Sequence, residues 1–498
     1  MKKQIDDAYL EYMLACNQEQ RDAAGDFFQR LDRQLQLGKG ECRRIREDFE
    51  KGLVWYAEHG VAFEEALTRL DPARLGGFYA RGPVLWYPLD SAAKVYPLSM
   101  KQGEMAVFRL SAYLYEPVVP ELLQLALTFT VRRFPGFATT VKKGFFWHYL
   151  DSWKGRYPVR EEQDRPCRAM KVGRTGANPF RVRYYKNRIS VEYFHLLTDG
   201  LGGMVFLKTL TAEYLRLLGV DSQPGHGVLD LTEPAAPEEF VNEFPRALQK
   251  SAAAGFADRG ALQLGGRRSR VNPCRVLRFC MDAEALREAA AKRDATVTAY
   301  LVSRVLWACR NATEDVNGDI SVQVPVNMRR YYPSRTLRNF AMYFGVRLPA
   351  GEIRDPDALL PAVKAQMAEK SSRENMDKMV ASTQRLVQMA RFLPLLVKFP
   401  AVQAVYGVLG DRIFTTTLSN LGRVSMPPEL EGHVQSMDFV LGSARVNRVM
   451  CSSVTFGSVA SLCIAKQTVD PTFEETLLSV LEQDGLQITV EGSPYYED

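Results

Sequence analysis

One histidine of the sequence stands in a setting that could support acid–base chemistry. The chain has five histidines, and His195 lies within the run Tyr-Phe-His-Leu-Leu-Thr-Asp-Gly-Leu-Gly-Gly at 193–203. The alternating residues of 189–195 predict a strand with His195 at its end. Asp199 and Gly200 follow on a short loop, which can hold an imidazole rigid at a cleft as a proton acceptor. These residues alone equally allow a loop histidine with a structural role.

Other kinds of active site find little support. No HExxH, Walker loop or DxDxDG occurs, and the eight cysteines form no CxxC pair, so we expect no metal site. The glycines at 200–203 fail as a dinucleotide loop because Val205 occupies the position of the third glycine. A GxSxG serine elbow is missing. Nothing near Cys451 or Cys463 in the sequence would activate a thiol.

The segment at 195–200 matches the HxxxDG core of the chloramphenicol-acetyltransferase-like, CoA-dependent acyltransferases. The chain resembles the bacterial alcohol acetyltransferase-like proteins of that superfamily over about residues 75–490. The resemblance rests on an ordered set of segments: Trp-Tyr-Pro-Leu-Asp-Ser-Ala-Ala-Lys at 86–94, Arg-Phe-Pro at 133–135, the strand 144–148, Val-Pro-Val-Asn-Met-Arg at 324–329, Asn-Phe at 339–340 and Leu-Ser-Asn-Leu-Gly at 418–422.

Two features depart from the family pattern. Phe194 stands where the fuller motif has a first histidine. Because the second histidine is the one assigned as the base, we expect this change to tune activity and not to abolish it. The DFGWG motif of the plant branch is absent, which argues against that branch only.

The resemblance implies a two-lobed α/β fold, each lobe a mixed β-sheet flanked by helices. It also implies transfer of an acyl group from acyl-CoA, with acetyl-CoA expected as co-substrate and no bound cofactor, to the hydroxyl of a small-molecule alcohol. His195 would act as the general base in a ternary complex and pass the proton to the departing thiolate. Asp199 would turn away from the histidine and pair with Arg329, and Gly200 would permit the backbone turn.

The sequence gives weaker support for residues that would stabilise the oxyanion than for His195 as the base. Thr415, Thr417 and Ser419 alternate onto one face of the expected strand 413–421, which the family places beside the channel between lobes, and Asn420 belongs to the same strand. Tyr343 is a further candidate donor. The strand residues could equally form the polar edge of a sheet, and Tyr343 could be a packed aromatic in the core.

Composition narrows the class of partner and the compartment. The 498 residues carry 64 Lys and Arg against 58 Asp and Glu, a net charge of +6, which gives no argument for nucleic-acid binding. The charged N-terminus predicts no signal peptide, and no stretch reaches the ~18 apolar residues of a membrane span. Scattered cysteines fit a reducing cytoplasm.

The elements that must position these residues fall into three parts. Residues 1–70, with 11 Lys and Arg against 14 Asp and Glu, predict two or three helices that form either an extension packed on the main body or a docking module. Residues 71–262 would form the lobe that carries HxxxDG, and residues 263–498 the second lobe. A Pro- and Gly-rich linker over 219–270 is expected to contain one helix at 237–254.

Within the lobes, hydrophobic periodicity predicts strands and helices. In the first lobe we expect strands at 104–113, 180–185 and 189–195, a pair of strands over 136–150, and helices at 118–134 and 201–218. In the second we expect strands at 275–281, 320–326 and 341–348, helices at 283–292, 298–310, 355–370 and 379–409, and a strand-rich tail over 413–490 with one helix near 472–483.

Several interpretations stay open. Basic clusters at 267–270 and 329–338 could meet the phosphates of CoA, although solvated charge explains the first cluster as well. The apolar run 379–409 predicts core helices or, as a less favoured alternative, a lipid-facing or long-acyl-binding surface with peripheral membrane contact. The chain could also be a condensation-like enzyme that uses a carrier-protein thioester, or a non-catalytic scaffold that keeps the fold.

Overall fold

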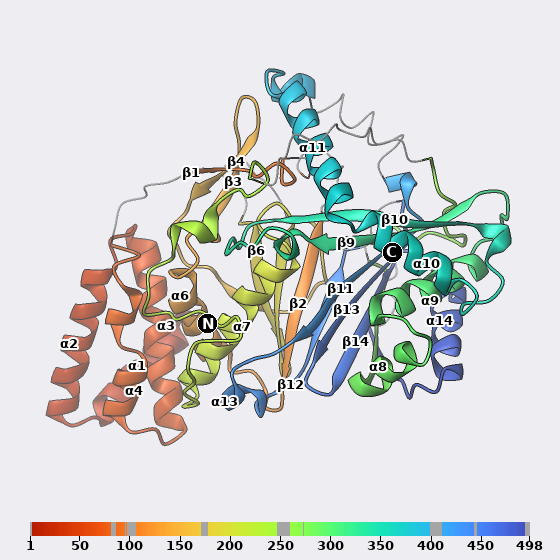
Figure 1. Ribbon diagram of the computed structural model, residues 1–498. Helices are drawn as coiled ribbons and strands as arrows, with labels where there is room; N and C mark the ends of the chain where they lie inside the picture. Colours follow the sequence, from red (N-terminus) through yellow and green to blue (C-terminus); the bar gives the residue numbers. More distant parts are fainter. Residues whose placement is uncertain are drawn as a thin grey trace.

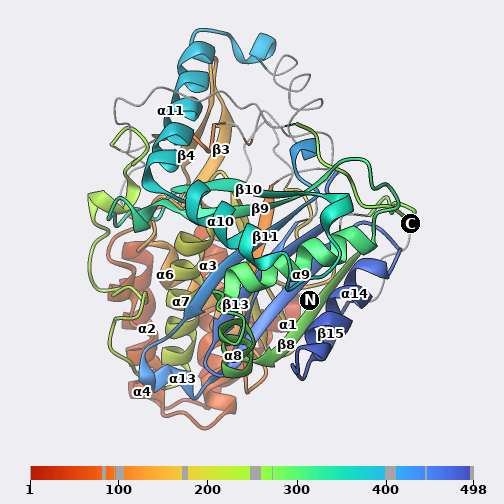
Figure 2. The same ribbon diagram turned by 45° about the vertical axis from the view of Figure 1, so that its right-hand side comes forward.

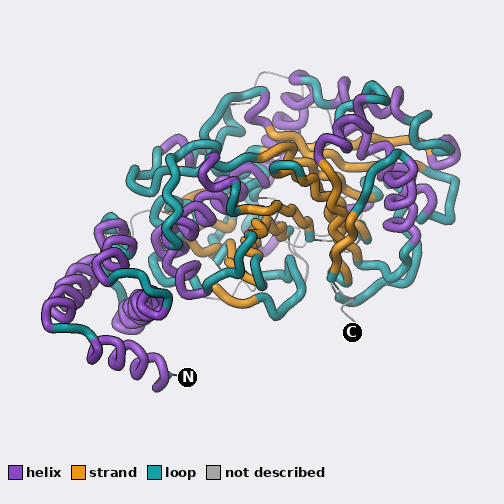
Figure 3. The backbone as a smooth tube through the Cα atoms, turned by 90° about the horizontal axis from the view of Figure 1, so that it is seen from below, coloured by secondary structure: helices purple, strands orange, loops and turns teal. Residues whose placement is uncertain are grey.

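A computed structural model describes residues 2–80, 86–94, 96, 106–170, 178–246, 259–271, 273–398, 411–442 and 446–493. Two lobes lie side by side, each built on a mixed β-sheet with helices against it (Figure 1). Four helices stack on the outer side of the first lobe, at the end of the molecule opposite the second lobe (Figure 3).

A five-stranded sheet forms the centre of the first lobe. Its neighbours are antiparallel except for one parallel pair at the edge. In order across the sheet the strands are β12 (Val434–Leu441), β2 (Val107–Leu114), β7 (Arg188–Phe194), β6 (Phe180–Tyr185) and β5 (Val159–Glu161). Two helices pack against each other and close the core above this sheet: α6 (Pro120–Val131) and α7 (Gly200–Leu217).

A seven-stranded sheet forms the second lobe. In order its strands are β10 (Ala341–Pro349), β9 (Asp319–Asn327), β11 (Thr416–Val424), β13 (Val449–Phe456), β14 (Val459–Lys466), β8 (Arg275–Asp282) and β15 (Thr489–Gly492). Strand β11 runs parallel to both of its neighbours, so this sheet is also mixed. Figure 2 shows the helices that cover its outer face: α8 (Ala283–Ala291), α9 (Val297–Asn311), α10 (Leu360–Lys370) and α14 (Thr472–Gln483).

The two lobes share one strand. Strand β12 comes from the second half of the chain but pairs with β2 in the sheet of the first lobe. The short helix α13 (Pro428–Glu431) leads into it, and Leu430 and Met437 are buried in the core of the first lobe. A boundary between residues 262 and 263 therefore separates the two halves in sequence but does not separate the two sheets completely.

The N-terminal segment folds as four helices, not as the two or three expected. They are α1 (Lys2–Ala15), α2 (Gln18–Gln34), α3 (Lys39–Glu58) and α4 (Phe63–Arg69). Phe49 packs edge-on against Phe129 of α6 at 5.8 Å, and the Tyr56 hydroxyl donates to the carbonyl of Leu217 at 2.6 Å. The buried Asp48 pairs with Arg156 of the first lobe. These helices thus continue the core of the first lobe.

A small sheet and a long helix project together beyond the two main sheets (Figure 1). The small sheet consists of β1 (Trp86–Pro88), β4 (His148–Ser152) and β3 (Thr139–Lys143), with β3 and β4 forming a hairpin. The helix is α11 (Arg373–Ala390), which belongs to the second half of the chain. Gln384 of α11 donates to the Ser91 hydroxyl at 2.7 Å, which ties the helix to the first lobe.

The prediction of a helix at 237–254 is wrong for the part that the structure describes. Only a 3₁₀ turn forms at Pro237–Phe240, and residues 241–246 are not helical, while 247–258 lie outside the described residues. Tertiary contacts explain this, because the Glu239 carboxylate binds Arg133 at 2.6 and 2.8 Å and its carbonyl accepts from the N–H of Leu337. Groups that a helix would bond internally are used by neighbouring elements.

The remaining expected elements are present with ends shifted by a few residues, within the described ranges. The expected helix at 379–409 corresponds to α11 and to a further helical segment over 395–398, and 399–410 lie outside the described residues. Among the described helices, none has both the length and the apolar character needed to cross a membrane.

Candidate functional site

His195 follows directly on β7 and lies at the end of that strand. Its N–H donates to the carbonyl of Ala106 at 2.7 Å. The imidazole is stacked on the ring of Tyr96 at 4.8 Å and 19°, and Phe108 of β2 meets it edge-on at 5.2 Å. Burial lowers the pKa of His195, and the histidine's own carbonyl and the charge of Asp199 offset part of this shift. The ring is therefore neutral at pH 7.

The second lobe supplies a neighbour to this ring. Nδ2 of the buried Asn339 lies 3.3 Å from Nδ1 of His195 and 3.3 Å from its carbonyl oxygen. Asn339 immediately precedes Phe340 and β10, so the contact joins the two lobes at the histidine. Sequence reasoning gave Asn339 no role of its own. The available signal was the Asn-Phe pair at 339–340.

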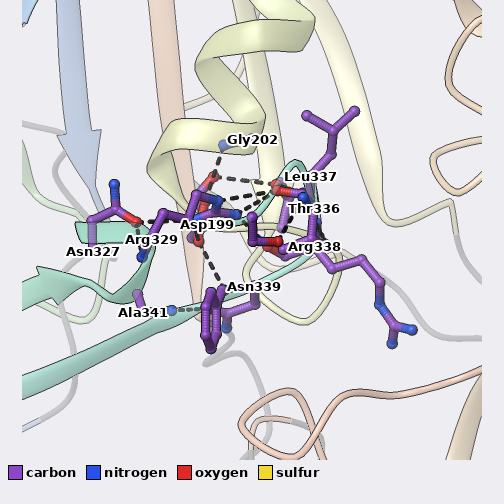
Figure 4. Close-up of polar contacts among 12 residues, drawn as sticks. Asp199, Gly202, Asn327, Arg329, Thr336, Leu337, Arg338, Asn339 and Ala341 are labelled. Atoms are coloured by element: carbon purple, nitrogen blue, oxygen red, sulfur yellow. Dashed lines mark hydrogen bonds and ion pairs between the residues drawn. The ribbon is translucent and has the colours of Figure 1, made fainter. Parts of the chain in front are cut away.

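Asp199 is buried and accepts three hydrogen bonds, none of them from His195 (Figure 4). Its Oδ1 accepts from the N–H of Gly202 at 3.0 Å, which caps the N-terminus of α7. Its Oδ2 accepts from the N–H of Phe340 at 2.8 Å and from Nη1 of Arg329 at 2.6 Å. The carboxylate thus binds the second lobe and fixes the start of a helix in the first.

The guanidinium of Arg329 is almost fully occupied by its surroundings. Beyond the carboxylate, it donates to the carbonyl of Thr336 from Nε at 3.1 Å and Nη2 at 2.8 Å, and to the carbonyl of Arg338 at 2.8 Å (Figure 4). The hydroxyl of Thr198 donates to the carbonyl of Leu337 at 2.6 Å. Side chains from both lobes therefore hold the loop at 336–338 in place.

Two glycines of the loop have different reasons to be glycine. Gly200, expected to permit a turn, has ordinary backbone as the first residue of α7, so that expectation is wrong. A Cβ there would meet only the flexible end of Leu421, at 2.6 Å. A Cβ at Gly202 would lie 2.2 Å from the carbonyl oxygen of Leu337 and 2.3 Å from the Thr198 hydroxyl. Gly202 is the position where the lobes approach too closely for a side chain.

The sheet of the second lobe has two distinct faces. Leu418 of β11 is buried under the helices, whereas Val454 and Phe456 of β13 belong to the core of the first lobe. Because strand residues alternate between faces, Thr417 and Ser419 lie on the face toward the first lobe. This is the face on which a group shared by both lobes must lie.

The other residues expected near the oxyanion are spread more widely. Asn420 lies on the opposite face, where its Nδ2 donates to the Thr298 hydroxyl of α9 at 3.1 Å, so the structure does not bring it together with Thr417 and Ser419. The Thr417 hydroxyl donates to Gln323 at 2.9 Å. Tyr343 lies on the inner face as well, but on β10, beyond β9.

A buried carboxylate that sequence reasoning did not single out lies between the small sheet and the same loop. Oδ1 of Asp90 accepts from the N–H of Ala93 at 2.7 Å, and its Oδ2 lies 3.9 Å from Nη2 of Arg338. The same Nη2 donates to the carbonyl of Pro88 at 2.5 Å. Burial raises the pKa of Asp90 to about 6, although Arg338 and the Ala93 N–H oppose the shift.

A cavity of about 480 Å³ lies over the small sheet. Its walls are mainly aromatic and are formed by Trp86, Pro88, Leu89, Lys94, Trp147, His148 and Tyr149. Nζ of the buried Lys398 lies 3.2 Å from the centre of the Trp147 ring. Burial, with help from the charge of Lys94, lowers the pKa of Lys398 to about 8. Burial lowers the pKa of His148 to about 4.

Metal and thiol chemistry have no support among the described residues. No group of three or more His, Cys, Asp or Glu side chains is arranged there to hold a metal ion. Burial raises the pKa of the thiols of Cys309, Cys451 and Cys463, so these cysteines are poor nucleophiles.

Comparison with known proteins identifies the fold. No protein-family model matches the sequence, and no curated protein sequence matches it either. Solved structures do match, at low sequence identity. Polyketide synthase associated protein 5 from Mycobacterium tuberculosis superposes with a TM-score of 0.54 at 13% identity, covering 80% of this chain and 98% of that one.

Two further structures agree. TRI101 from F. sporotrichioides, solved with Coenzyme A and T-2, gives a TM-score of 0.55 at 12% identity over 81% of this chain and 100% of that chain. The first condensation domain of the calcium-dependent antibiotic synthetase, solved with a substrate analogue, gives 0.52 at 13% identity over 81% and 95%. The predicted fold class, two lobes with mixed sheets flanked by helices as in condensation-domain and chloramphenicol-acetyltransferase-like proteins, is confirmed.

Proposed function

We propose that this protein is an acyltransferase that moves an acyl group from a CoA thioester to the hydroxyl of an alcohol, with His195 as general base. The observation that carries the proposal is a neutral imidazole at the contact between two lobes, with Nδ2 of Asn339 from the second lobe 3.3 Å from its Nδ1. A base must be unprotonated to accept a proton, and burial keeps His195 in that form at pH 7. The likeness to TRI101, which was solved with Coenzyme A, supports the choice of donor.

The surroundings of the ring favour one tautomer. The carbonyls of His195 and Thr198, which can only accept, both raise the pKa of the ring as hydrogen-bond partners, and we propose that the proton facing the His195 carbonyl is on Nδ1. Asn339 then donates to the same carbonyl oxygen at 3.3 Å. Nε2 keeps its lone pair and is the nitrogen that accepts the proton of the alcohol as the alcohol oxygen attacks the thioester carbonyl. The imidazolium returns that proton to the thiolate as the carbon–sulfur bond breaks.

Asp199 and Arg329 act as positioning residues in this scheme. The carboxylate is fully engaged by Gly202, Phe340 and Arg329, so it cannot relay a proton from the ring. Its charge still favours the imidazolium that forms during the reaction. The pair fixes the loop that follows His195 relative to the second lobe.

We propose Ser419 as the first candidate to donate a hydrogen bond to the oxyanion. Its side chain lies on the inner face of β11, where the lobes meet. Thr417 shares that face, but its hydroxyl already donates to Gln323. Tyr343 is a weaker candidate because it lies two strands away, on β10. Loss of one such donor typically lowers kcat by roughly 10²–10³.

The proposal is tested by measuring thiol release from acetyl-CoA with a panel of alcohols. We expect release that depends on the alcohol, and a loss of roughly 10²–10⁴ in His195→Ala, the usual contribution of a general base. His433→Ala is the matched control, because His433 is exposed and should leave the rate unchanged.

Each other outcome refutes a stated part. Unchanged turnover in His195→Ala would exclude this residue as the base. Transfer from a thioester on a carrier protein, without transfer from CoA, would identify a condensation-like enzyme, as the fold of the antibiotic-synthetase domain also permits. No transfer from either donor by folded protein would favour the non-catalytic scaffold.

A further inference from the structure

Large apolar side chains gather at one end of the molecule. Of the sixteen that are exposed in the described part of the chain, seven come from two short segments: Phe145, Phe146, Met389, Phe392, Leu393, Leu396 and Val397. We call these seven residues the apolar tip. Exposure is extreme at its centre, at 72% for Phe145, 71% for Phe392 and 89% for Leu396. A contiguous apolar patch on a protein surface marks an interaction site.

The two segments form a single surface. Phe145 and Phe146 lie in the turn of the β3–β4 hairpin, and the other residues lie at the end of α11 and just beyond it. The N–H of Leu395 donates to the carbonyl of Phe145 at 2.9 Å, and Nζ of Lys398 donates to the carbonyl of Phe146 at 2.8 Å. Hairpin and helix project together away from the body of the protein (Figures 1 and 2).

The charge around the tip has one sign. Residues 139–150 and 378–398 contain no Asp or Glu, and their charged residues are Lys142, Lys143, Lys378, Arg385, Arg391 and Lys398. Lys142 and Lys378 pair with acids just outside these ranges, and Lys398 is buried. Lys143, Arg385 and Arg391 are exposed beside the apolar side chains.

We propose that the apolar tip docks this protein on an anionic lipid bilayer. The exposed aromatic and aliphatic side chains can enter the acyl boundary of such a membrane, and the basic groups beside them can bind its anionic headgroups. The tip is a projection and not a groove, so it can enter a bilayer interface without a partner shaped to receive it. Complementary charge favours an anionic lipid as the occupant.

The position of the cavity gives this docking a consequence. Trp147, His148 and Tyr149 of the same hairpin line the cavity of about 480 Å³, and Lys398 lies over Trp147. The segment 86–94, whose strand β1 pairs with β4, also lines the cavity and is followed by Tyr96, whose ring is stacked on His195. A molecule dissolved in the bilayer would meet the tip first. If the proposed acyl transfer holds, its acceptor or acyl group is one that partitions into lipid.

Co-sedimentation of the full chain with vesicles tests the docking without any enzymatic readout. We expect binding to vesicles of phosphatidylcholine with 30% phosphatidylglycerol in ~0.1 M salt, and much weaker binding to phosphatidylcholine alone. In Arg385→Gln/Arg391→Gln the partition coefficient should fall roughly 30-fold, because each basic residue near an anionic surface contributes about fivefold. Phe392→Ser/Leu396→Ser should lower binding to both lipids by more than roughly tenfold.

A matched control separates the tip from general surface hydrophobicity. Leu14 of α1 and Tyr115, which directly follows β2, are exposed at 73% and 62% and belong to neither tip segment, so Leu14→Ser/Tyr115→Ser should bind like the parent. The proposal is overturned if no vesicle is bound, if the neutral and anionic vesicles bind equally, or if the tip variants bind like the parent. It is equally overturned if the tip variants abolish self-association in solution while the parent ignores lipid, which would make the tip an interface between copies. Failure of thiol release with docking intact would refute only the proposed function.

Discussion

Replacing Arg329 by methionine should lower the free energy of unfolding more than replacing an exposed arginine does, because Arg329 lies at the junction between the lobes. The Arg329 and Asp199 side chains are 8% and 5% exposed, so their ion pair has little solvent screening. Removing one partner of such a pair costs about 3–5 kcal/mol, because the other charge stays buried without compensation. Three further bonds, to the carbonyls of Thr336 and Arg338, are lost with the same side chain.

A double-mutant cycle in urea measures the coupling directly. Asp199→Asn alone leaves the guanidinium buried without its partner, whereas Asp199→Asn/Arg329→Met removes both charges. The loss in the free energy of unfolding should therefore be smaller in the double variant than the sum of the two single losses, by about 2–3 kcal/mol. Arg330→Met is the matched control, because its side chain is exposed one residue along the chain. The enzymatic readout should be a lower kcat with little change in KM, partly restored by Arg329→Lys. Additive free energies, or a kcat equal to that of the parent in Arg329→Met, would refute the positioning role.

Three further predictions concern single residues. Because burial lowers the pKa of His195 from 6.5 and the base acts when neutral, the midpoint of the acid fall in kcat/KM should lie below pH 6.5. A midpoint above 6.5 would contradict this. Gly202→Ala should destabilise by about 1–3 kcal/mol, since its Cβ would overlap the carbonyl of Leu337, whereas Gly200→Ala should cost less; equal melting temperatures would refute the steric reasoning. The pKa of Asp90 is about 6 in the folded state, above its ordinary 3.8, so the folded state binds the proton more tightly than the unfolded state does. The free energy of unfolding should therefore fall as pH rises from 4 to 6. Asp90→Asn should remove up to about 3 kcal/mol of this pH dependence, measured by urea titrations.

Sequence reasoning succeeded where local patterning and structure agree. The strands expected at 180–185 and 189–195 form the hairpin of β6 and β7, and Lys186 in its turn adopts the left-handed backbone (φ 50°) that such a turn needs. The helix expected near 472–483 forms at Thr472–Gln483, where acidic residues lie in the first turn and apolar residues recur at helical spacing. The two-lobed fold followed from ordered motifs, not from periodicity. Periodicity also failed at 237–254, where contacts with Arg133 and Leu337 outweigh the local preference.

The candidate site was predicted only in its local half. His195, Asp199 and the glycines lie within eight residues, so their spacing already indicated a rigid loop. Asn339 lies 144 residues from His195, and the carbonyl that excludes a side chain at Gly202 lies 135 residues away, at Leu337. Asn420 shows that residues adjacent in the sequence need not lie together in the site. It neighbours Ser419 in the sequence, but strand alternation points it to the other face.

These long-range contacts make the site a product of lobe association. Neither lobe alone contains His195 together with Asn339, or Asp199 together with Arg329. Strand β12 crosses from the second half of the chain into the first sheet, so the lobes cannot separate without breaking the sheet of the first. Opening at the site is therefore expected to involve the projecting elements, and not a hinge that parts the lobes. Hydrogen exchange should then show the β12 amides that bond to β2 protected to the same extent as the β2 amides, and faster exchange of those β12 amides alone would contradict this coupling.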